Sequence, residues 1–79
     1  SAVPKRVKFK SIKFEADKNI VLIEGTASGD QDILKLISNL NGKKLVSQAT
    51  LTSMTLPSTA NNSTQAMKGF KIICKLENA

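Results

Sequence analysis

The feature that most constrains this chain is a change of hydrophobic period between Asn19 and Leu40. Residues 20–23 (IVLI) form an unbroken apolar run with three β-branched members, as is typical of a short buried strand. From residue 30 onward, apolar residues recur with the spacing of one helix face, at Ile33, Leu36, Ile37 and Leu40. A strand followed by a short amphipathic helix needs a sheet to pack against, so the rest of the chain is expected to supply one.

Residues around this unit predict where the strand and the helix begin and end. Gly25 predicts a turn after the strand. Ser28 and Gln31 have the spacing of a capping box, with Asp30 as an alternative cap. Gly42 predicts the end of the helix, because glycine readily takes the left-handed conformation that follows a helix.

Residues 7–15 (VKFKSIKFE) alternate like a strand, but the alternation changes phase. Val7 and Phe9 are odd-numbered, whereas Ile12 and Phe14 are even-numbered. A strand can keep all four on one face only if it contains an extra residue. We therefore expect a bulge or bend near residues 10–11.

The C-terminal half supplies two more strands. Residues 45–54 are rich in Thr, and residues 70–76 alternate between apolar residues and Lys, with Cys74 on the apolar side. The polar stretch between them has no periodicity. We expect a flexible tail at residues 1–6 and a single domain at 7–77, with a mobile loop at 55–67. The predicted fold is α+β, a ferredoxin-like ββαββ two-layer sandwich in which one helix covers one face of a four-stranded, largely antiparallel sheet.

Composition argues against catalysis. The 79 residues are enough for one small domain, and they include no His and a single cysteine, Cys74. His-based catalysis, a His-containing metal site and an internal disulfide are therefore excluded. Asp30 and Asp32 fall in the predicted first helical turn, where acids complement the helix dipole. We expect no enzymatic activity, no cofactor and no metal, and a structural role for Cys74 in the core.

Positive charge suggests an alternative function. Twelve Lys and Arg residues against six Asp and Glu give a net charge of +6. The candidate anion-contact residues cluster near the start of the chain: Lys5, Arg6, Lys8, Lys10 and Lys13. The alternative is therefore a basic binding module for an anionic polymer or a lipid surface. Nucleic acid is not the expected partner, because one Arg and no free aromatic platform are a poor basis for recognising it.

A single short helix covers only one face of a four-stranded sheet, so the other face is open to solvent or to a partner. Because side chains alternate along a strand, Ile20 and Leu22 point to one face of the sheet, and Val21 and Ile23 point to the other. The candidate partner-contact residues are Val21, Ile23 and Ile73. An alternative is that β-branched residues on a wet face serve strand propensity alone.

Several segments together resemble a known family. They are a strand that runs into a glycine and small residues (21–28, VLIEGTAS), an amphipathic helix ending in Leu (33–40), spaced apolar positions at Val46, Ala49 and Leu51, and a final Phe-led strand with Phe70, Ile72 and Cys74. This pattern resembles the periplasmic domain of PilN-type fimbrial assembly proteins of the type IV pilus machinery. The resemblance covers roughly Phe9 to Leu76, and ferredoxin-like domains of type II secretion systems look similar.

The resemblance implies a scaffold rather than a catalyst. It implies a soluble domain excised from a single-pass membrane protein, on the periplasmic face of the bacterial inner membrane. Its partner would be a PilO-like homologous domain or a second copy of itself, and it would contact the membrane only through a segment absent from this chain. The leading expectation is thus a non-enzymatic structural and interaction domain of the type IV pilus alignment subcomplex or a related secretion system, acting by homo- or heterodimerisation.

Overall fold

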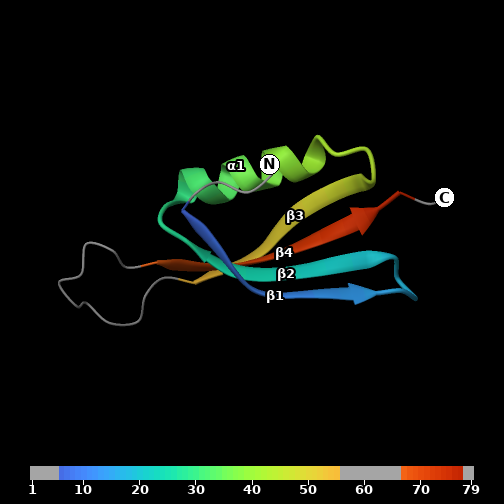
Figure 1. Cartoon of the computed structure of the whole chain (residues 1–79), viewed down its shortest axis with the longest axis horizontal. Helices are drawn as coiled ribbons and strands as arrows, with labels where there is room; N and C mark the ends of the chain where they lie inside the picture. The colour runs from blue at the N-terminus through green and yellow to red at the C-terminus, as the bar shows by residue number, and fades with distance from the viewer. Residues whose placement is uncertain (1–5, 56–66, 78–79) are drawn as a thin grey trace.

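Four antiparallel strands and one helix make up the fold of the computed structural model, which describes residues 6–55 and 67–77. In chain order the elements are β1 (Val7–Glu15), β2 (Ile20–Ala27), α1 (Asp30–Asn41), β3 (Val46–Thr55) and β4 (Lys68–Leu76). The strands form one sheet in the order β1-β2-β4-β3, with α1 packed on one face (Figure 1). The predicted ββαββ fold is confirmed. The predicted tail at 1–6 and loop at 55–67 fall mostly outside the described residues and stay predictions.

A bulge in β1 lies where the sequence predicted it. Phe9 is opposite Gly25 of β2, yet Ser11 is already opposite Glu24, so Lys10 is an extra residue in the ladder. Opposed residues in an antiparallel pair point to the same face, and one inserted residue therefore reverses the parity of everything after it.

The bulge keeps the apolar side chains of β1 together on the side of α1. Beyond it, Ile12 is opposite Ile23 and Phe14 is opposite Val21. Ile23 belongs to the core, so Ile12 and Phe14 also lie on the face that carries α1. Without the extra residue they would point to the other face.

The core lies between α1 and the sheet, and all four strands contribute to it. Ile33 and Leu36 of α1 are 1% and 0% exposed, and Ile72 of β4 is 1% exposed. Full burial of an aliphatic side chain of this size contributes about 1.5–3 kcal/mol to the free energy of unfolding. The other buried residues are Val7, Ile23, Ala27, Ala49, Phe70 and Cys74.

Gly25 does not form a turn, in contrast to the prediction. Strand β2 continues through it to Ala27, and its φ is not positive. Its importance is steric, because a Cβ atom at this position would lie 2.8 Å from the ring of Phe70 and would collide with the carbonyl oxygen of Lys8. Phe70 is 3% exposed, so the glycine makes room for a core aromatic ring.

The start of α1 differs from the predicted capping box. Gly29 is the N-cap residue, and it has no side chain with which to cap the helix. The prediction that Ser28 and Gln31 form a capping box is therefore wrong. Asp30 and Asp32 do lie in the first turn, where their charge complements the helix dipole.

The end of α1 is fixed by a side chain rather than by a left-handed glycine. Gly42 follows the helix as predicted, but with φ −85° and ψ −4° it is right-handed. The side chain of Asn41 pairs with edge strand β3: its Oδ1 accepts a hydrogen bond from the Ala49 N–H at 2.8 Å, and its Nδ2 donates to the Ala49 carbonyl at 3.3 Å. These two bonds hold α1 over the β3 side of the sheet.

Substitution of Gly25 tests the steric argument. We expect Gly25→Ala to lower the free energy of unfolding by about 1–3 kcal/mol, because the added methyl group overpacks the site beneath Phe70. Gly42→Ala is the matched control: its Cβ would meet the nearest atom at 3.5 Å, and its backbone suits any residue. The control should be neutral or stabilising by up to about 1 kcal/mol in urea denaturation. Equal effects of the two substitutions would contradict the packing described for Phe70.

Candidate protein-interaction site

The face of the sheet opposite α1, hereafter the outer face, has an apolar centre. Leu22 of β2 is opposite Ile73 of β4, and both are partly exposed. The same row continues to Lys13 on β1 and Thr50 on β3. Two aliphatic side chains thus lie side by side in the middle of the outer face, with polar residues at both edges.

The predicted partner-contact residues are divided between the two faces. Val21 and Ile23 point towards α1, where Ile23 is 7% exposed and Val21 packs against the core. This corrects their grouping with Ile73, because strand alternation places Leu22, not its neighbours, beside Ile73. Of the three predicted residues, Ile73 alone lies on the outer face.

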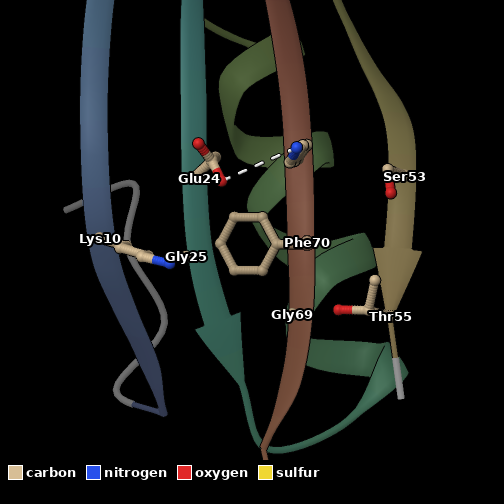
Figure 2. Close-up of a pocket in the computed structure, with 8 residues that line it drawn as sticks. Lys10, Glu24, Gly25, Ser53, Thr55, Gly69 and Phe70 are labelled. Atoms are coloured by element: carbon tan, nitrogen blue, oxygen red, sulfur yellow. Dashed lines mark ion pairs between the residues drawn. The ribbon is translucent and has the colours of Figure 1, made fainter. Parts of the chain in front are cut away.

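A shallow hollow of about 120 Å³ adjoins this apolar centre. Figure 2 shows it from the outer side, with the Phe70 ring between β2 and β4 and with Lys10 and Glu24 at its margin. Glu24 Oε2 lies 4.0 Å from Nζ of Lys71, and both side chains are well exposed. Ligand pockets usually enclose about 300–1,000 Å³, so this hollow suits a single protruding side chain better than a cofactor.

The predicted cationic cluster is also divided. Lys5 lies outside the described residues. Arg6 is at the start of β1, where its Nη2 lies 3.1 Å from Oδ2 of Asp32 in an ion pair that lacks hydrogen-bond geometry. Lys8 and Lys13 are on the outer face, and Lys10 occupies the bulge beside the hollow.

A comparison with protein families gives the decisive observation on identity. The model of the family described as "Fimbrial assembly protein (PilN)" matches residues 1–76. The chain belongs to the PilN family. Searches of curated proteins and of solved structures found no match. The predicted resemblance is confirmed, and membership implies a structural role in fimbrial, type IV pilus, assembly. In the part of the chain that is described, no helix is long and apolar enough to cross a membrane.

Three residues of this PilN domain that could suggest catalysis or metal binding have structural roles instead: Asp30, Asp32 and Cys74. Asp30 Oδ1 accepts a hydrogen bond from Nζ of Lys68 at 2.7 Å, and Asp32 pairs with Arg6. Cys74 is 2% exposed, and burial raises the pKa of its thiol, so the nucleophilic thiolate is disfavoured. Among residues 6–55 and 67–77, no cluster of His, Cys, Asp and Glu could hold a metal ion.

Two lysines of the outer face were not among the predicted site residues. Lys71 and Lys75 flank Ile73 along β4, and they face the same side as Lys8 and Lys13. About sixty positions separate them from the N-terminal cluster, so proximity in sequence could not group them. The signal was the alternation of β4, which puts Lys71, Ile73 and Lys75 on one side.

Proposed function

We propose that this PilN domain is a non-enzymatic interaction domain of the type IV pilus alignment subcomplex, or of a related secretion system. In this proposal it lies on the periplasmic face of the bacterial inner membrane. There it pairs with a PilO-like homologous domain or with a second copy of itself. Family membership supports the assembly role, and the outer face supports the mode of contact.

The observation that carries the proposal is the pair Leu22 and Ile73, two large apolar residues that face away from the core at the centre of the sheet. Burial of such side chains by a partner is favourable, at about 25 cal/mol per Å² of apolar surface. The lysines around them make contact with an acidic partner surface more favourable than contact with a basic one. Residues Val21 and Ile23 contribute indirectly, because Ile23 lies in the core and Val21 packs against it, which keeps β2 in place.

Sedimentation of paired variants tests this contact. We expect Ile73→Asp to weaken association with itself or with a PilO-like domain by about tenfold or more, because it places a charge at the centre of the interface. Ile12→Asp makes the same change at a 59% exposed residue on the opposite face, and it should leave this association unchanged. Analytical ultracentrifugation, alone and with the candidate partner, gives both measurements.

Folding must be separated from binding, since Ile73 is partly buried. Thermal unfolding followed by circular dichroism shows whether each variant is folded. The milder substitution Ile73→Thr removes apolar surface while it retains strand propensity. If both variants at residue 73 fold and associate like the unmodified protein, the outer face is not the contact. A strict monomer that binds no partner domain would count equally against the proposal.

The arrangement of lysines favours one further function, binding of an anionic surface. The outer face carries Lys8, Lys13, Lys71 and Lys75, with Glu15 and Glu24 as its acids. Binding to vesicles of anionic phospholipid should then weaken steeply with salt. The combined Lys13→Ala and Lys75→Ala variant should reduce that salt dependence, whereas Lys35→Ala, on α1, should not. Absence of binding at low salt would exclude this function.

A further inference from the structure

The hollow on the outer face is lined mainly by side chains that donate hydrogen bonds. Four of its lining side chains supply a donor: Lys10, Ser53, Thr55 and Lys71. Its margin has one acidic residue, Glu24. Within residues 6–55 and 67–77, the Lys10 ammonium and the two hydroxyls have no hydrogen-bond or ion-pair partner. A concave site lined by such donors is complementary to an acceptor group.

The hollow exists because β4 has a glycine, Gly69, on the outer face. Gly69 is opposite Thr26 of β2 and Thr55 of β3. A Cβ atom at this position would lie 2.5 Å from Oγ1 of Thr55, and Figure 2 shows the Thr55 hydroxyl pointing towards Gly69. The backbone does not require glycine, because φ of Gly69 is not positive. A glycine inside a strand often marks a place where another group approaches closely, which is the role we assign to Gly69.

The hollow is continuous with the apolar centre formed by Leu22 and Ile73. Glu24 and Lys71 are opposite each other two positions further along β2 and β4, so they lie on the same face as that pair. A strand rises about 3.4 Å per residue, which puts the edge of the hollow about 7 Å from the apolar centre. One partner surface can therefore cover both.

Charge indicates which acceptor fits the hollow. Glu24 is already engaged: its Oε1 accepts a hydrogen bond from Ser11 Oγ at 3.5 Å, and its Oε2 lies 4.0 Å from Nζ of Lys71. Lys10 has no acidic partner of this kind, and Figure 2 shows its side chain extending from β1 towards Gly25. A carboxylate that enters the hollow would meet Lys10 and two hydroxyls, whereas a cationic side chain would meet two ammonium groups. A partner that excludes water from the contact would strengthen the new ion pair.

We propose that the hollow receives an Asp or Glu side chain of the partner domain, which binds between the Lys10 ammonium and the hydroxyls of Ser53 and Thr55. The apolar residues beside that acid then cover Leu22 and Ile73. This inference rests on the proposed function, since it assumes that the outer face is the contact. It adds the chemistry that makes the contact specific: an acidic side chain about 10 Å from an apolar patch, at the spacing of three residues along a strand.

A second copy of this chain is a poor source of that carboxylate. The acids of its outer face are Glu15 and Glu24, and Glu24 already lies beside Lys71. Pairing two outer faces would also bring the same lysines against one another: Lys8, Lys13, Lys71 and Lys75. Like charges that face each other across an interface disfavour the complex. The partner is therefore a domain with a different, acidic contact face.

Filling the hollow tests the proposal without changing its charges. We expect Gly69→Ala to weaken association of the 79-residue protein with a PilO-like domain by about tenfold, because the methyl group takes the space of the entering carboxylate. The added atom meets only the end of the Thr55 side chain, which can rotate, so the variant should fold. Gly42→Ala adds the same methyl group at the end of α1 and should leave association unchanged. Circular dichroism verifies folding, and analytical ultracentrifugation measures association.

Two further substitutions test the chemistry of the hollow rather than its volume. Thr55→Val keeps the shape of the side chain and removes the hydroxyl, so it should weaken association about threefold. Lys10→Glu should weaken it by about tenfold, and Lys10→Arg should not. Lys35→Glu makes the same change of net charge on α1 and is the control. Changing the acidic residues of the partner to Lys one at a time should reveal one that restores binding to the Lys10→Glu variant.

The outcomes separate this proposal from the proposed function. If Ile73→Asp abolishes association while Gly69→Ala and Lys10→Glu associate like the unmodified protein, the outer face is the contact and the hollow takes no part in it. If none of the three changes association, the proposed function fails as well. Equal effects of Lys10→Glu and Lys35→Glu would mean that net charge alone matters, and would overturn the proposal. Self-association that Gly69→Ala weakens would also overturn it, because a second copy would then fill the hollow.

Discussion

The extra residue at Lys10 determines which way the apolar side chains of β1 point, and much of the surface chemistry depends on it. With the bulge, Phe9, Ile12 and Phe14 share the face of α1, and the lysines on either side of the bulge share the outer face. Without it, Ile12 and Phe14 would stand beside Leu22 on the outer face, in a single mixed surface. One inserted residue therefore separates an apolar strip from a lysine-rich face.

The off-centre position of α1 is the second feature that determines which surfaces of the domain are exposed. Asn41 satisfies the backbone of Ala49 on edge strand β3 and fixes the helix over that side. At the other side Arg6 and Asp32 join the start of β1 to the first turn of α1, and β1 then diverges from the helix (Figure 1). The face of the sheet that carries α1 thus has a well-packed half and an open half.

The order of elements and the bulge in β1 were predictable because large apolar residues mark them. Val7 and Phe9 before the bulge, and Ile12 and Phe14 after it, record the change of phase directly in the sequence. Two register shifts in β3 were not predicted, although the apolar residues around them change from even-numbered Val46 to odd-numbered Ala49 and Leu51 and back to even-numbered Met54. The role of Gly25 could not be predicted either, because the close approach of Phe70 exists only after β2 and β4 pair. The facing of Val21 and Ile23 depended in the same way on tertiary packing, since both alternations of an all-apolar strand are equally consistent with its sequence.

A direct test of the central claim is the cross-strand register of β1 and β2 in solution. Nuclear Overhauser contacts between the backbone protons of opposed residues report it without any substitution. The bulge predicts contacts of Ile12 with Ile23 and of Phe14 with Val21. Contacts of Ile12 with Leu22 instead would mean that Lys10 is an ordinary ladder residue. Both the shared facing of Phe9, Ile12 and Phe14 and the separation of the two faces would then be contradicted.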